Sequence, residues 1–179
     1  MSGYTVIDVE TTGLSPEKGD RVVEIGVVYV SDDGHLQDHW STLINPQRDV
    51  GPTRIHGITA SDVVSAPTFG DIAPYVLRAV TGRTVVAHNA SFDLRFLAAE
   101  LNRAGVPLRG LPLSGLCTMQ WSSAYLNAAS RRLVDCCRAC GVPLTDAHSA
   151  AADAIATAHL LSHYLTASSY EPPWGETIA

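Results

Sequence analysis

Thr5-Val6-Ile7-Asp8-Val9 is the first apolar run of the chain, and two longer runs, Val22–Val30 and His35–Ile44, follow it. Asp32-Asp33-Gly34 separates the second run from the third. An Asp-Gly pair between apolar-rich segments is typical of a tight hairpin turn. The opening of the chain therefore predicts three successive antiparallel strands.

The pattern changes to alternating helices and strands after residue 45. Asn45-Pro46 and Gly51-Pro52 mark a loop, and Thr84–Ala87 is a short apolar strand. Helical patterns are predicted at residues 69–80, 91–104, 118–127, 131–140 and 149–166. The order of elements predicts one α/β domain over residues 1–167. Pro172-Pro173 cannot continue a helix, so residues 168–179 are expected to form a C-terminal tail.

The composition is that of a globular domain. Of 179 residues, 46% are hydrophobic and 17% are charged, and the formal net charge is −6. This charge argues against a broadly basic nucleic-acid-binding surface. The N-terminal residues lack the pattern of a secretory signal, and no apolar run is long enough to span a bilayer. We therefore expect a cytoplasmic protein with no membrane association.

The cysteines allow two interpretations. Leu133, Cys136, Cys137 and Cys140 are spaced as the buried stripe of an amphipathic helix. A zinc site would need a second ligand pair, and none lies nearby in sequence. We favour buried free thiols, and zinc remains the alternative.

Two carboxylates share one face of the first strand. Alternate side chains of a strand point the same way, so Asp8 and Glu10 project together, whereas Ile7 and Val9 point to the other face. Such a pair repels unless a cation lies between its members, and a hard, oxygen-binding cation suits it. Taken alone, such a pair is weak evidence, because an isolated pair is more often a solvated strand face.

A second polar cluster, His88-Asn89-Ala90-Ser91-Phe92-Asp93, begins where the strand Thr84–Ala87 ends and a helix starts. Sites in α/β folds commonly lie at such junctions. Asp93 in the first helical turn also fits a residue that only favours the helix dipole. Phe92 fits either the core or a stacking platform for a base.

The third cluster contains His148 and Asp153. Five helical residues turn through about 140° around the axis, so both side chains reach one site only if His148 precedes the helix. Ser149 as the N-cap permits that arrangement. A histidine beside a helix-borne carboxylate suits a hydrolase, in which one group deprotonates water and another holds a metal.

Together these clusters resemble the DEDDh 3′–5′ exonucleases, a DnaQ-like family, and most closely its proofreading ε-subunit-like branch. The matching runs are Asp8-Val9-Glu10-Thr11-Thr12-Gly13-Leu14, the cluster at 88–93, and His148 with Asp153. Ile55-His56-Gly57-Ile58-Thr59 resembles a loop of that branch. The resemblance implies a ribonuclease H-like fold, a five-stranded mixed sheet flanked by helices.

The resemblance also implies the roles of individual residues. Two divalent cations, Mg²⁺ or Mn²⁺, would be bound by four carboxylates, and His148 would be the general base. Activity should then rise from mildly acidic to mildly alkaline pH, because a histidine with an unperturbed pKa of about 6.5 must be neutral to accept a proton. The metal ligands implied are Asp8, Glu10, Asp93 and Asp153, and the substrate-binding residues implied are Thr11, Thr12, Leu14, His56, His88, Asn89 and Phe92.

The function implied is removal of nucleoside 5′-monophosphates from a single-stranded or frayed 3′ end of DNA, in proofreading or repair. The alternatives are an exoribonuclease that trims RNA ends and a non-catalytic nucleic-acid-binding module. A DNA polymerase is a less favoured partner, because the chain lacks an obvious long C-terminal extension. The sequence does not distinguish DNA from RNA or indicate the oligomeric state, the processivity or the pathway.

Overall fold

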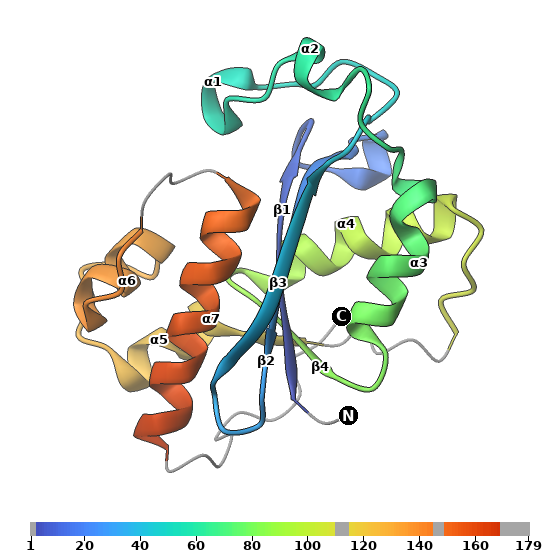
Figure 1. Cartoon of the computed structure of the whole chain (residues 1–179). Coiled ribbons are helices and arrows are strands. Elements are labelled where there is room, and N and C mark those ends of the chain that lie inside the picture. Colours follow the sequence, from blue (N-terminus) through green and yellow to red (C-terminus); the bar gives the residue numbers. More distant parts are fainter. Residues whose placement is uncertain (1–2, 110–114, 145–148, 169–179) are drawn as a thin grey trace.

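A five-stranded mixed sheet forms the centre of the molecule (Figure 1). The computed structural model describes residues 3–109, 115–144 and 149–168. The strand order is β3-β2-β1-β4-β5. β1, β2 and β3 run antiparallel to one another in succession, and β4 and β5 run parallel to β1. The strands are β1 (Tyr4–Thr11), β2 (Val22–Val30), β3 (Leu36–Leu43), β4 (Thr84–Ala87) and β5 (Gly115–Cys117).

The helices largely occupy the segments that the sequence predicts. Five of them confirm those predictions to within two residues at either end: α3 (Phe69–Val80), α4 (Ala90–Arg103), α5 (Thr118–Tyr125), α6 (Leu133–Cys140) and α7 (Ala150–Ala167). Three short helical segments were not predicted, namely η1 (Pro16–Lys18), α1 (Thr53–His56) and α2 (Ala60–Val63).

Helices cover both faces of the sheet, as Figure 1 shows. On one face α3 and α4 pack against odd-numbered residues of β1 and β2, including Ile7, Val9 and Ile25. On the other face α6 and α7 pack against even-numbered residues, including Val6 and Val28. Because successive side chains of a strand point to opposite faces, alternate residues of β1 and β2 belong to two separate cores, one on each face of the sheet.

Two local predictions are confirmed. Gly34 adopts a positive φ of 87° in the turn between β2 and β3, which a residue without Cβ adopts readily. Cys136 and Cys137 of α6 are buried in one core cluster with residues of α7 and have free thiols, whereas Leu133 and Cys140 of the predicted stripe are only partly buried. No helix among the described residues is both long and apolar enough to cross a membrane. The predicted tail lies outside the described residues beyond residue 168.

Candidate active site

Asp8 and Glu10 lie on the face of β1 that α7 covers. The register of the β1–β2 pair places Gly26 opposite Asp8 and Glu24 opposite Glu10. Farther back on the same face, Val6 belongs to the core beneath α7. Along this face of β1, the apolar side chain of Val6 is therefore followed by the carboxylates of Asp8 and Glu10. These carboxylates lie at the end of the sheet near the first turn of α7.

Asp153 completes a compact acidic group. It lies in the first turn of α7, and one ligand atom from each of Asp8, Glu10 and Asp153 lies within 4.8 Å of the others. All three side chains are partly buried. Asp8 and Glu10 are separated from Asp153 by most of the chain, so only the docking of α7 on the sheet brings them together.

Asp93 adjoins this acidic group and has a backbone partner of its own. Its side chain is 3% exposed, and Oδ1 accepts a hydrogen bond of 3.2 Å from the amide of Val9. Asn89, the residue that precedes α4, adopts a left-handed conformation with φ of 79°. This sharp turn lets α4 begin directly after β4, with Asp93 in its first turn.

The acidic groups repel one another strongly. Burial, and then repulsion by Asp93, Asp153, Glu10 and Glu24, raises the pKa of Asp8 well above its ordinary value. Burial followed by repulsion from Asp153 and Glu24 raises the pKa of Glu10 to about 8. Burial likewise raises the pKa of Asp93 to about 8, although hydrogen bonds from backbone amides act in the opposite direction. Carboxylates in this state favour protons or cations, and their oxygens suit hard divalent metals.

His148 lies outside the described residues. Ser149 is the N-cap of α7, as predicted, and α7 begins at Ala150. The side chain of Ser149 makes no capping hydrogen bond, however. The predicted position of the N-cap is therefore confirmed, but the side-chain hydrogen bond expected of an N-cap is not.

Two threonines follow β1 and fix the next loop. Thr11 Oγ1 donates to the carbonyl of Gly13 at 2.7 Å. Thr12 Oγ1 accepts from the amide of Arg21 at 3.0 Å and lies 3.3 Å from Asp20 Oδ1. Both threonines are buried, whereas Leu14 is 78% exposed. Leu14 is therefore the apolar side chain that this loop presents to solvent.

The two predicted substrate-binding histidines use both ring nitrogens within the protein. His56 Nδ1 accepts from the amide of Ile58 at 3.1 Å, and Nε2 lies 3.2 Å from the carbonyl of Val50. His88 Nε2 lies 2.9 Å from the carbonyl of Arg131, and Nδ1 lies 2.9 Å from the hydroxyl of Thr118. A carbonyl only accepts, so both Nε2 atoms donate. Burial lowers the pKa of His88, which favours this neutral form.

Phe92 lies at the edge of the core rather than inside it. It is partly buried, and its ring centroid lies 4.9 Å from that of Phe96 in a tilted arrangement. Part of the Phe92 ring is exposed, so the structure is compatible with the second interpretation, in which Phe92 is a platform for a base.

Glu24 was not predicted as part of the site. Its carboxylate raises the pKa of both Asp8 and Glu10, which places it beside the acidic group. The signal that points to it is a charged residue inside the otherwise apolar run Val22–Val30. That run pairs with the strand carrying Asp8 and Glu10.

Carboxylates gathered at the end of a mixed sheet suit a class of enzymes in which bound divalent cations promote phosphoryl chemistry. The family model described as "Exonuclease" matches residues 5–161. The chain therefore belongs to the exonuclease family, and within it to the DnaQ-like 3′–5′ exonucleases.

Two relatives agree with this assignment. "DNA polymerase III PolC-type" of Clostridium perfringens is 33% identical over 165 residues, which cover 88% of this chain and 11% of that protein. "DNA polymerase III subunit epsilon" of Treponema pallidum is 43% identical over 101 residues, which cover 55% of this chain and 46% of the relative. The chain thus matches less than half of either relative's length.

A solved structure of E. coli exonuclease I in complex with a dT13 oligonucleotide has the same fold. It superposes with a TM-score of 0.80 at 18% identity and covers 93% of this chain and 41% of that one. This likeness confirms the ribonuclease H-like fold that the sequence resemblance implied.

Proposed function

We propose that this chain is a metal-dependent exonuclease domain that hydrolyses the last phosphodiester bond at a 3′ end of DNA, in proofreading or repair. The product is a nucleoside 5′-monophosphate. The observation that carries the proposal is the convergence of Asp8, Glu10 and Asp153, whose ligand atoms lie within 4.8 Å of one another. Membership of the exonuclease family supports it.

The donor set fits Mg²⁺ or Mn²⁺, because all its members are carboxylates. Asp8, Glu10, Asp93 and Asp153 would hold two such cations, whose charge of +4 offsets the −4 of the ligands. Bound cations would supply an activated water and stabilise charge on the leaving 3′ oxygen. The carboxylates would hold the cations in place, and His148 would take the proton from the attacking water.

The terminal nucleotide would contact the side chains left available around the acidic group. Leu14 is exposed and Phe92 is partly covered, so both suit contacts with a base or sugar. Asn89 is the N-cap of α4, three residues before Phe92. The ring nitrogens of His56 and His88 are already bonded within the protein. These histidines would shape the pocket, as Thr11 and Thr12 would, and would not read the nucleotide through those nitrogens.

Single-stranded DNA is the substrate that the comparisons favour. The exonuclease I neighbour is described in complex with a dT13 oligonucleotide, and the relatives are named as parts of DNA polymerase III. A polymerase is accordingly a candidate partner, which co-purification with the replicative enzyme of the same organism would test.

The decisive experiment is cleavage of a 5′-labelled single strand of about 20 nucleotides with Mn²⁺, analysed as a ladder of shortened strands. We expect stepwise loss from the 3′ end and release of mononucleotides, abolished by a chelator. Asp153→Asn should reduce the rate by about 100-fold or more, because misplaced catalytic groups cost that much. Asp38→Asn, an exposed carboxylate of β3, is the matched control.

Undiminished cleavage by Asp153→Asn, or internal cuts in place of a 3′ ladder, would contradict the proposal. A parallel assay on an RNA strand of the same sequence decides the nucleic acid. Preference for RNA would replace the DNA substrate by RNA ends and would retain the hydrolytic site.

A further inference from the structure

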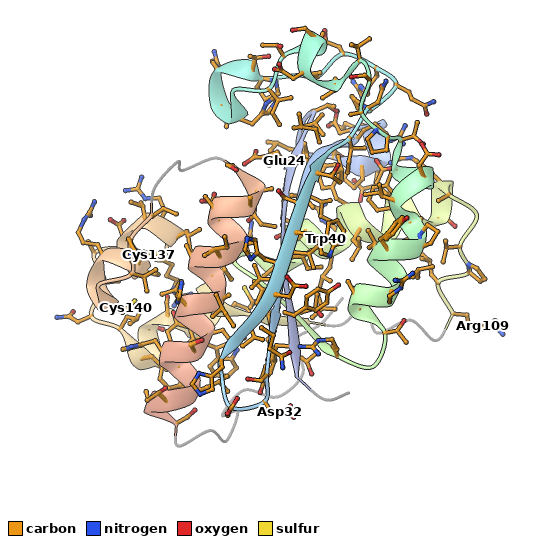
Figure 2. All side chains as sticks on the ribbon, viewed as in Figure 1. Glu24, Asp32, Trp40, Arg109, Cys137 and Cys140 are labelled. Atoms are coloured by element: carbon orange, nitrogen blue, oxygen red, sulfur yellow. The ribbon has the colours of Figure 1, made fainter. Side chains whose placement is uncertain are left out.

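Helix α7 is capped at its beginning by a residue from another element. The first amides of a helix have no partner within the helix. Its own N-cap, Ser149, makes no side-chain capping bond. Instead, Glu24 Oε2 accepts the hydrogen bond of the Ala150 amide at 3.0 Å, across 126 positions of sequence. Figure 2 shows Glu24 at the end of the sheet where α7 begins.

Gly26, two residues after Glu24 on β2, allows the same close approach of α7. Gly26 follows Glu24 on the same face, and a Cβ added there would lie 2.2 Å from the carbonyl oxygen of Ala150. Such a distance is far inside van der Waals contact, so only glycine lets α7 approach this closely. Glu24 thus holds the first residue of α7 while Gly26 makes room for it.

These two positions of β2 are also the partners of the acidic residues of β1. Glu24 faces Glu10, and Gly26 faces Asp8. Asp153 lies three residues after Ala150, less than one helical turn away. The hydrogen bond that fixes the position of Ala150 therefore also determines the position of Asp153 relative to Asp8 and Glu10.

Glu24 stands beside the acidic group without belonging to it. The ligand atoms that lie within 4.8 Å of one another come from Asp8, Glu10 and Asp153, among the residues that the structure describes. A further carboxylate next to such a group is electrostatically unfavourable. The hydrogen bond from α7 and the positive end of its dipole offset that cost.

We propose that Glu24 is a positioning residue, which caps α7 across the sheet and thereby sets Asp153 in register with Asp8 and Glu10. This inference rests on the proposed function for its catalytic consequence. The capping itself does not depend on that function, and it can be measured without activity.

The test compares Glu24→Ala with Glu24→Gln. Alanine removes the acceptor, whereas the glutamine side chain keeps an oxygen for the Ala150 amide but has no charge. We expect Glu24→Ala to speed hydrogen exchange in the first turn of α7 by about five- to ten-fold, the loss typical of an N-cap. Mn²⁺ binding should weaken by a similar factor. The kcat should fall by about ten- to hundred-fold, with the KM for the DNA strand unchanged.

Glu24→Gln should stay within about three-fold of the wild type in all three measurements, because the acceptor is retained. Gly26→Ala should reproduce the defects of Glu24→Ala, since it displaces the same residue of α7. Asp38→Ala removes an exposed carboxylate of β3 and controls for loss of charge alone.

Two results would overturn the inference. If Glu24→Gln loses Mn²⁺ binding as fully as Glu24→Ala, the charge of Glu24 acts on the cations and capping is not its role. If Glu24→Ala exchanges and binds Mn²⁺ like the wild type, α7 does not need the cap. A wild-type protein that cuts neither DNA nor RNA would refute the proposed function alone, and the exchange data would still decide the capping.

Discussion

Asp93 differs from the other carboxylates of the site because it also holds the backbone of β1. Its Oδ1 accepts from the Val9 amide at 3.2 Å. Replacing it by alanine would leave that buried amide without this partner, which typically costs about 1–3 kcal/mol. Asparagine keeps an oxygen acceptor and removes only the charge.

We expect Asp93→Asn to abolish metal-supported cleavage and to keep the thermal stability of the wild type. The substitution removes a proposed cation ligand and also removes repulsion toward Asp8. Single-turnover cleavage with Mn²⁺ and the melting temperature would be measured on the same preparation. Asp93→Ala should lose both activity and stability, so equal stability of the two variants would argue against the role of the Val9 contact.

At the scale of residues, the sequence predicted the positions of the acidic groups better than the partners of the histidines. Asp8 and Glu10 share a face and Asp153 lies in the first turn of a helix, as local patterns of the sequence predicted. Their convergence depends on the docking of α7, and only the family resemblance implied it. The hydrogen bonds of His88 to Thr118 and Arg131 join distant segments, and no local pattern announces them. Glu24 was missed for the same reason, since its partner Ala150 belongs to the last helix.

An ion pair between Glu100 of α4 and Arg21, the residue before β2, fastens these two elements together. Glu100 is 1% exposed, and its carboxylate accepts from Arg21 Nε at 2.6 Å and from Arg21 Nη2 at 2.8 Å. It also accepts from the Val22 amide at 3.2 Å. Both elements carry residues beside the acidic group, so the pair bears on the geometry of the site.

We expect Glu100→Ala to lower the free energy of unfolding by about 3–5 kcal/mol, because it leaves a largely buried guanidinium without its partner. Urea denaturation measures this change. The control is Glu17→Ala, whose side chain is 62% exposed and lies 3.8 Å from Arg95. It should unfold at the wild-type urea concentration, and an equal loss in both variants would contradict a special role for the buried pair.

The elements that the sequence failed to predict are the short ones. Helices α1 and α2 have four residues each, and β5 has three. Such segments are too short to display a periodic pattern. Packing stabilises them instead, since Ile58 and Val63 bury against Val23 and Val50 in a small core of their own. β5 exists as a strand through its pairing with β4.

The acidic group makes the stability of the protein depend on pH. The pKa of Glu10 and that of Asp93 are raised to about 8 in the folded protein, so without metal the folded state retains protons that the unfolded chain releases near pH 4. Stability must then fall as pH rises toward 8. His88 is neutral in both states above about pH 7 and does not obscure this interval.

We therefore expect the chelator-treated protein to unfold at less urea at about pH 8 than at about pH 7. Added Mn²⁺ should raise stability and flatten the dependence, because cations replace the protons and bind only the folded site. Asp93→Asn without metal should show a shallower slope than the wild type. A rise in stability over this interval would contradict the raised pKa values.

The four cysteines differ in burial, and this difference predicts the order in which their thiols react. Cys117, Cys136 and Cys137 are at most 2% exposed, and burial raises the pKa of Cys137 to about 12. The thiolate is the reactive form, so we expect iodoacetamide to modify the partly exposed Cys140 before the other three. Figure 2 shows Cys137 and Cys140 on α6. Mass spectrometry of partly modified protein measures the order, and stoichiometric zinc in purified protein would instead revive a metal role for these cysteines.

The distance along the chain between β1 and α7 has a consequence for synthesis on the ribosome. The hairpin that carries Asp8, Glu10 and Glu24 is translated before α7, and Ala150 and Asp153 emerge more than a hundred residues after it. A nascent chain can build most of the sheet and still lack the helix that brings the last carboxylate. The proposed hydrolytic site can therefore be completed only after α7 has been synthesised.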